Sequence, residues 1–475
     1  MLANLTEFKI EKLHGRRTID IPFVDNRLVL VGENGAGKST VANLIFYFLT
    51  RQWLRLKEYQ FSSLQAVVSG QTFRITHEEV QLLVGRRRSL HDVGVHFRFR
   101  RGRQILADLD LDLEELGPIE SPHFTRTVES LSEEMEMPQE FVRDFLREQQ
   151  KAHKIPPKLS QTLQNLRSLD FGQFLYLPTY RRIEQDLKSI FRGVEIEDKV
   201  REFRERIRKR KSPTFVELVE FGMEDVEKTI SDRMARIKES VRTGLNNLTG
   251  TYLREVLRGL DDPETDAAIL KTIDPKVFES IFARIDEAIL PASDKSLLKA
   301  RIDNISPGSG YGIGSDDKVI AHFLSKLVAL YKQQQDGEMD VRAFVHLCNA
   351  YLTGKELIFD DVNYGIYIRQ QTSSPLEGEG GDKLELKMLS SGEKQIVSLF
   401  SHIYFSGDRN YFVIIDEPEL SLSVPWQQRF LPDIIGTGRC TGLIAVTHSP
   451  FIWENELEPF VRSLAQFIEM PNAIR

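Results

Sequence analysis

The stretch VLVGENGAGKSTV at Val29–Val41 decides the fold of this chain. The pattern G-x-x-x-x-G-K-[ST], whose backbone N–H groups wrap phosphates, is met by Gly32, Gly37, Lys38 and Ser39. An apolar, strand-like run precedes the motif, and apolar residues at helical spacing follow it, as a strand–loop–helix unit requires. The stretch therefore predicts a nucleoside triphosphate site at the N-terminus of a helix.

Each part of this motif has a chemical task. Lys38 is expected to reach the β- and γ-phosphate oxygens, and the Ser39 hydroxyl to ligate Mg²⁺. A glycine-rich turn with a purely structural role is the alternative, but the Lys-Ser pair and the preceding strand argue against it. The predicted nucleotide-binding residues are Gly32, Glu33, Asn34, Gly35, Ala36, Gly37, Lys38, Ser39 and Thr40.

A second group of motifs follows far along the chain. Met388–Gln395 reads MLSSGEKQ, one apolar run leads into Asp416 in the phrase DEPE, and another leads into His448 in the phrase THSP. Ser390 precedes Asp416 by 26 residues, and Asp416 precedes His448 by 32. Asp416, at a strand end, is expected to hold Mg²⁺ through its water shell. The neighbouring Glu417 is the candidate general base, and His448 is expected to contact the γ-phosphate.

In this order and spacing, the motifs resemble those of the ABC-type ATPases, and DEPELSLSVPWQ with VTHSPF resembles their soluble SMC and OLD-nuclease branch. Under this resemblance Ser390, Ser391 and Gly392 match the signature motif, Asp416 and Glu417 the Walker B pair, and His448 the switch histidine. The resemblance implies ATP and Mg²⁺ as cofactors. It also implies that Ser390, Ser391, Gly392 and Glu393 complete the nucleotide site of a second copy of the chain.

The chain departs from the ABC-type pattern at two positions. Ser391 stands where the signature usually has its first glycine, and Ser423 stands where related sequences carry histidine. The glutamine of the Q-loop has three candidates, Gln60, Gln65 and Gln173. Slow hydrolysis, with ATP acting mainly as a switch, is consistent with these departures.

Two short sequence segments narrow the resemblance to one family within this branch. LPTYRRIE (Leu177–Glu184) and VEFGMEDVEK (Val219–Lys228) are similar to the ATPase subunit of the Septu anti-phage systems, which also occur with retrons. This implies a regulatory subunit of bacterial antiviral defence whose partners are an HNH-type nuclease and, in some systems, a reverse transcriptase with its RNA–DNA product. Nothing in the chain resembles a nuclease. The alternative is a DNA-maintenance or recombination ATPase of the SMC or RecF kind.

Composition limits the setting in which the protein works. The 475 residues carry a net charge of −7, and two distant cysteines, Cys348 and Cys440, imply neither a disulfide framework nor a zinc site. No signal peptide or membrane span is predicted, so a cytoplasmic location is expected. Seven arginines against one acid lie between Gly85 and Arg103, and seven bases against two acids lie in Arg201–Lys211. These clusters predict contacts with a nucleic-acid backbone, although a solvated basic surface is the alternative.

The predicted fold class is α/β: an ABC-type ATPase head with a mixed sheet and a P-loop core, split by a mainly helical insertion with a short coiled-coil-like segment. The predicted parts are an N-terminal ATPase lobe (1–180), the helical insertion (181–351) and a C-terminal ATPase lobe (352–475). Helices are expected over Val200–Lys211 and Val216–Thr243, and strands over Val93–Phe99 and Lys383–Lys387.

Overall fold

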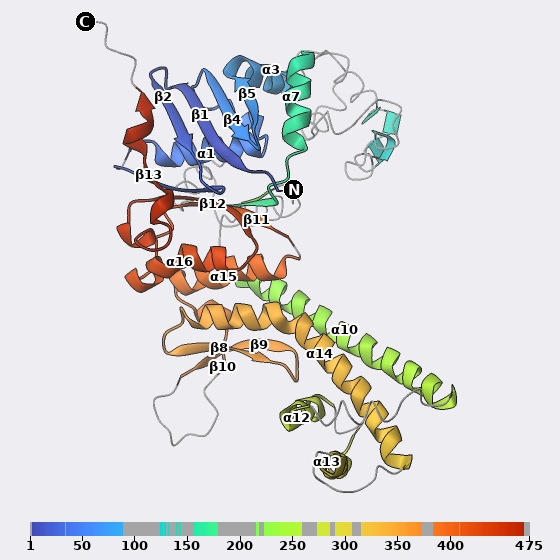
Figure 1. Cartoon of the computed structure of the whole chain (residues 1–475). Coiled ribbons are helices and arrows are strands. Elements are labelled where there is room, and N and C mark those ends of the chain that lie inside the picture. The colour runs from blue at the N-terminus through green and yellow to red at the C-terminus, as the bar shows by residue number, and fades with distance from the viewer. Residues whose placement is uncertain are drawn as a thin grey trace, which may run out of the picture. The chain divides into compact units, whose positions relative to one another are not determined.

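The computed structural model describes residues 2–33, 35–88, 156–178, 215–217, 223–258, 273–285, 290–305, 315–371, 383–407 and 409–469, with short stretches between 124 and 143. The chain divides into two compact units. The first comprises Met1–Val219, Asn410–Glu419 and Ser423–Arg475, and the second comprises Glu220–Arg409 and Leu420–Leu422. Figure 1 shows the elements of both units, coloured along the chain.

Within the described residues, the first unit contains a six-stranded parallel sheet with the order β13-β3-β12-β11-β6-β7. Its strands are β3 (Arg27–Val31), β6 (Gln173–Leu177), β7 (Phe215–Glu217), β11 (Tyr411–Asp416), β12 (Cys440–Thr447) and β13 (Val461–Ser463). Every residue of β6 and β11 is buried. Such continuous apolar strands are typical of parallel sheets that are covered on both faces.

A second sheet of the first unit is antiparallel and, over the described ranges, has the strand order β14-β2-β1-β4-β5. Its strands are β1 (Leu5–Leu13), β2 (Arg17–Pro22), β4 (Ser63–Val68), β5 (Gln71–Thr76) and β14 (Ile468–Glu469). One hydrophobic core joins this sheet, helix α1 (Lys38–Leu49) and the parallel sheet.

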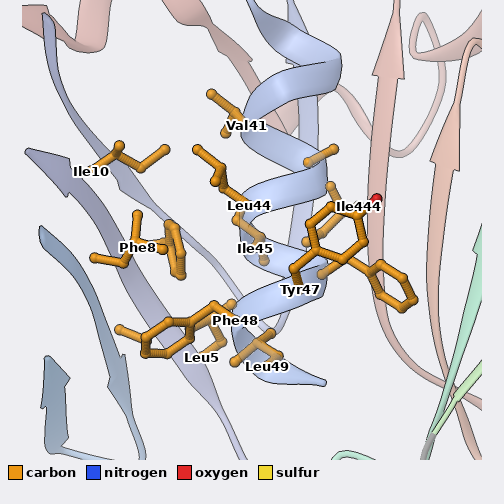
Figure 2. Close-up of a cluster of buried hydrophobic side chains, with 14 of the residues drawn as sticks. Leu5, Phe8, Ile10, Val41, Leu44, Ile45, Tyr47, Phe48, Leu49 and Ile444 are labelled. Atoms are coloured by element: carbon orange, nitrogen blue, oxygen red, sulfur yellow. The ribbon is translucent and has the colours of Figure 1, made fainter. Parts of the chain in front are cut away.

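Helix α1 lies between the two sheets. Figure 2 shows Leu5, Phe8 and Ile10 of the antiparallel sheet on one side of this helix and Ile444 of β12 on the other. Every residue from Val41 to Leu49 is buried, because a helix covered on two sides must be apolar around most of its circumference. The helix that begins at the phosphate-loop motif is therefore held in the core of the unit.

Further helices lie around these layers in the described part of the first unit. They are α2 (Trp53–Leu56), α3 (His77–Arg88), α7 (Pro157–Arg167) and α16 (Val424–Gly436), with the 3₁₀ turns η4 (Pro450–Ile452), η5 (Glu458–Phe460) and η6 (Leu464–Phe467).

The second unit is mainly helical. It contains α10 (Met223–Arg258), α12 (Pro275–Arg284), α13 (Ala292–Ile305), α14 (Ser315–Asn349), α15 (Ser391–Phe405) and η3 (Leu386–Met388), with a small antiparallel sheet of β8 (Lys355–Asp360), β9 (Gly365–Gln370) and β10 (Lys383–Leu384). The long helices α10 and α14 pack against each other and against α15. No helix in the described part of the chain is long and apolar enough to cross a lipid bilayer.

The predicted α/β class with a P-loop core and a mainly helical second part is confirmed. One predicted helix is wrong at its start: Phe215–Glu217 forms β7 because it pairs with β6, and α10 begins only at Met223. The strand predicted over Lys383–Lys387 ends at Leu384 and gives way to η3. Val93–Phe99 and Val200–Lys211 lie outside the described residues, and the division at residues 180 and 351 stays a prediction.

Candidate functional site

The carboxyl ends of three adjacent strands form the edge at which the predicted site residues meet. Strand β12 lies between β3 and β11, with Thr447 opposite Val31 and Val446 opposite Asp416. The loops that follow these strands therefore begin at one edge of the sheet. In open α/β sheets, ligands bind at this edge.

The loop after β3 needs glycine for its backbone shape. Gly35 and Gly37 have φ angles of 77° and 101°, in the left-handed region that residues with a side chain rarely adopt. A Cβ at either position would meet no atom within 4 Å, so the requirement is conformational and not steric. Gly37 caps α1, whose first N–H groups therefore open onto the loop and favour an anion. Asn34 lies outside the described residues.

The Lys38 side chain contacts both the phosphate loop and His448. Its Nζ donates to the carbonyl oxygens of Gly32 (2.8 Å) and Glu33 (3.1 Å) and lies 2.7 Å from Nε2 of His448. Burial lowers the pKa of Lys38, and it outweighs the opposite effect of three nearby carboxylates, those of Asp416, Glu417 and Glu419. The Lys38 ammonium group is therefore a buried cation in contact with the carbonyl oxygens of the phosphate loop.

Ser39 and Asp416 supply paired oxygen atoms. The Ser39 hydroxyl donates to Oδ1 of Asp416 at 2.9 Å, and Asp416 is the buried last residue of β11. A hydroxyl and a carboxylate suit Mg²⁺, which takes one or two protein oxygens and completes its shell with water and substrate phosphates. The described residues contain no group of three or more His, Cys, Asp or Glu side chains that could hold a metal. A magnesium ion that arrives with a nucleotide needs no such group.

Glu417 has an unusual backbone conformation. Its φ is 53°, in the left-handed region, and its N–H donates to the Val446 carbonyl oxygen at 2.8 Å. The chain therefore turns directly after Asp416, so the two consecutive carboxylates leave the strand in different directions. Strained backbone of this kind is concentrated at functional sites.

The loop after β12 carries His448 and is held by side chains from the β11–α16 region. Glu419 accepts from the Thr447 hydroxyl (2.8 Å) and from the His448 backbone N–H (2.9 Å). Gln427 accepts from the Ser449 hydroxyl at 2.6 Å. Glu419 and Gln427 were not predicted as site residues, because their hydrogen-bond partners lie 22 to 29 residues away in the chain. The only available signal was the position of Glu419 inside the DEPE phrase.

The residues of the signature-like motif belong to the second unit. Ser390 caps α15, its backbone N–H donates to Oε2 of Glu393 at 2.7 Å, and its hydroxyl accepts from the Glu393 N–H. Lys355 donates to the same carboxylate at 2.9 Å. Burial tends to raise the pKa of Glu393, but the hydrogen bonds from Ser390 and Lys355 outweigh it and lower the pKa. Glu393 therefore caps its own helix as a carboxylate, and Ser391 and Gly392 lie in the first helical turn.

The other predicted residues are distributed differently. Of the Q-loop candidates, Gln65 lies in β4, and Gln173 stands opposite Tyr411, at the start of β6 and β11 and away from Asp416. Arg86–Arg88 belong to α3, and the rest of both basic clusters lies outside the described residues. Ser423 is the residue before α16.

The family model of the AAA ATPase domain matches residues 4–453. Among solved structures, the chain is similar to the Smc head domain with an extended coiled coil, bound to the C-terminal domain of ScpA, from Pyrococcus furiosus. The identity is 12%, the match covers 95% of this chain and 91% of that chain, and the TM-score is 0.32. The Smc head domain with a coiled coil and joint from Pyrococcus yayanosii matches at 13% identity, with 95% and 93% coverage and a TM-score of 0.28.

Comparison with curated proteins found no significant match. The family model, in contrast, spans nearly the whole sequence and includes the phosphate loop, the Asp416 region and His448. The chain therefore belongs to the AAA ATPase domain family.

Proposed function

We propose that the chain binds ATP with Mg²⁺ and hydrolyses it to ADP and phosphate. The observation that carries this proposal is the meeting of the phosphate loop, Asp416, Glu417 and His448 at one edge of a parallel sheet. These residues come from opposite ends of the sequence, and their chemistry is that of phosphoryl transfer to water.

Each residue has a role in the proposed reaction. The N–H groups of the phosphate loop and Lys38 bind the phosphates, and Lys38 and His448 face the γ-phosphate. Ser39 and Asp416 would hold Mg²⁺, which supplies charge neutralisation when it is bound. Glu417 takes a proton from the attacking water, and its strained backbone fixes the direction of its carboxylate.

Phosphate release and ATP binding by the purified chain test this proposal. Lys38→Ala should weaken ATP binding by about 10- to 100-fold, because it removes a charge-assisted hydrogen bond to phosphate. Glu417→Gln should keep ATP binding but lower the turnover rate by about 100-fold or more. Glu456→Ala, which changes an exposed glutamate elsewhere in the same unit, is the control. Wild-type turnover in Glu417→Gln would contradict the proposed base.

We further propose that two copies of the chain close around ATP, with Ser390, Ser391, Gly392 and Glu393 of one copy completing the site of the other. The support is the ABC-type motif order and the location of these residues at the N-terminus of α15, where N–H groups favour an anion. The Glu393 charge does not oppose this role, because Lys355 and the Ser390 N–H group bind its carboxylate.

For the biological role, we propose a regulatory subunit of an antiviral defence system that controls a separate HNH-type nuclease. A reverse transcriptase with its RNA–DNA product is a further proposed partner, and the two basic clusters are the proposed nucleic-acid contacts. The Septu-like phrases and the absence of a nuclease motif from the sequence support this role. Lys38→Ala and Glu417→Gln should both abolish phage protection when the chain is expressed with its neighbouring genes. Protection that survives both changes would contradict an ATP-controlled switch.

The second candidate is a DNA-maintenance or recombination ATPase of the SMC or RecF kind. The observation that favours it is a pair of long helices, α10 and α14, of 36 and 35 residues. They pack against each other, as the two helices of an SMC coiled-coil arm would. The neighbouring gene distinguishes the two roles: a nuclease gene supports defence, and replication genes support DNA maintenance.

A further inference from the structure

Glu419 makes two hydrogen bonds that the proposed reaction does not use. It lies in the turn after β11, two residues beyond Glu417, and it is partly exposed. One carboxylate oxygen accepts from the Thr447 hydroxyl at 2.8 Å, and the other accepts from the His448 backbone N–H at 2.9 Å. A single side chain thus holds two consecutive residues of the loop after β12.

These bonds fix the position of an exposed residue. Thr447 is fully buried at the end of β12, whereas the His448 side chain is exposed and has little packing to hold it. The imidazole can lie 2.7 Å from Nζ of Lys38 only while the backbone that carries it stays in place. Hydrogen bonds to an ionised carboxylate are about twice as strong as those between neutral groups.

We infer that Glu419 is a positioning residue for ATP hydrolysis, whose carboxylate holds the backbone of Thr447 and His448 so that the His448 ring faces Lys38 at the phosphate loop. This inference rests on the proposed function. It gives Glu419 no contact with nucleotide. The competing explanation is that Glu419 acts through its charge, as a magnesium ligand or a second base.

Glutamine at position 419 separates the two explanations. A carboxamide has the shape of the carboxylate, so its oxygen can still accept from the His448 N–H. Its NH₂ group can donate to the Thr447 hydroxyl oxygen, which is also an acceptor. Glu419→Gln therefore keeps the positioning contacts and removes the charge, whereas Glu419→Ala removes both.

Steady-state kinetics test the inference. Glu419→Ala should lower kcat by about 10- to 100-fold and leave KM for ATP within about threefold, because the phosphate loop is intact. Glu419→Gln should stay within about threefold of wild type, as should the control Glu456→Ala. In a His448→Ala background, Glu419→Ala should cause no further loss, since it acts through His448. Wild-type kcat in Glu419→Ala, an equal loss in Glu419→Gln, or additive losses in the double variant would overturn the inference.

Hydrogen–deuterium exchange of the nucleotide-free protein gives a second readout that needs no activity. In a peptide spanning residues 446–452, Glu419→Ala should raise the exchange rate of the amides at 447–449, while Glu419→Gln and Glu456→Ala leave it unchanged. Unchanged exchange in Glu419→Ala would overturn the inference even if the chain hydrolyses ATP. A wild-type chain without turnover would instead remove the proposed function, and the exchange data would then still decide whether Glu419 holds the loop.

Discussion

Lys38 is a buried lysine, and burial costs its charged form free energy. Burial lowers its pKa below the usual lysine value and outweighs the nearby carboxylates. Because the proposed phosphate contact needs the charged form of Lys38, ATP affinity should be highest below the lowered pKa and should fall as pH rises through it. The free energy of unfolding of the free protein should change the other way and rise over the same window, because the unfolded chain binds the proton more tightly.

Calorimetric titration of ATP from about pH 7 to about pH 10 checks this pH dependence. The expected result is a loss of affinity that begins below the usual titration range of lysine and is missing from the residual binding of Lys38→Ala. Constant wild-type affinity to the upper end of this range, or an equal decline in Lys38→Ala, would contradict the assignment of the titration to Lys38.

At the residue scale, the sequence was enough to find groups whose role follows from local spacing. The glycines, Lys38 and Ser39 lie within one short loop, so their convergence follows from the chain itself. Glu419 and Gln427 could not be found in this way, because their roles depend on β12 lying beside β11. An isolated sequence does not contain that pairing.

Helices α12 and α14 are joined by a buried ion network. Arg284 donates to Glu338 at 2.9 Å, and their side chains are 8% and 0% exposed. Arg284 also donates to Asp361. Arg342 donates to the same two carboxylates, those of Glu338 and Asp361. Burial tends to lower the pKa of Arg284, but the hydrogen bonds to Glu338 and Asp361 outweigh it and raise the pKa. Arg284 therefore stays charged although it is buried.

Glu338→Ala should destabilise the protein by about 3–5 kcal/mol, because it leaves a buried guanidinium without its main counter-charge. Urea denaturation followed by circular dichroism measures the change. The control is Arg242→Ala, which breaks the exposed pair with Glu239 and should leave the unfolding midpoint unchanged. Equal midpoints for the two variants would show that the network contributes nothing to stability.

Two glycines in α10 provide a matched test of its packing. Gly250 has open space around a Cβ, so Gly250→Ala should stabilise the protein by about 0.5–1 kcal/mol through helix propensity. A Cβ at Gly244 would lie 2.6 Å from Cδ1 of Leu330 on α14, so Gly244→Ala should gain less than Gly250→Ala. Thermal unfolding of the two variants compares them directly. A larger gain at Gly244 would contradict the close approach of the two helices.

At the element scale, strongly apolar or periodic segments were predictable and short ones were not. Strands β11 and β12 and helix α1 follow from apolar runs beside recognisable motifs. Strand β7 was predicted as part of a helix, since three residues carry too little pattern and the pairing with β6 decides their structure. The predicted helix also stopped at Thr243, whereas α10 continues through Gly250 to Arg258.

For the whole molecule, the order of the motifs in the sequence predicted one divided site. The first unit brings the phosphate loop, Asp416, Glu417 and His448 together, whereas the signature-like motif belongs to the second unit. The strand order β3-β12-β11 and the antiparallel sheet that covers α1 could not be predicted, because both rest on pairings between distant segments. Contacts group residues 220–409 in one compact unit. The predicted domain boundary between residues 351 and 352 stays a prediction.

In the proposed dimer, ATP joins two copies of the chain through the site that contains Lys38 and Glu417. Light scattering of the purified protein with and without Mg²⁺-ATP tests it most directly. Glu417→Gln is expected to bind ATP and to hydrolyse it only slowly, so adding Mg²⁺-ATP should shift its mass from the 54.7 kDa of one chain to twice that value. Lys38→Ala should need about 10- to 100-fold more nucleotide for the same shift in mass, because its affinity for ATP is lower by that factor. A Glu417→Gln protein that is saturated with ATP and still has the mass of a single chain would contradict the account.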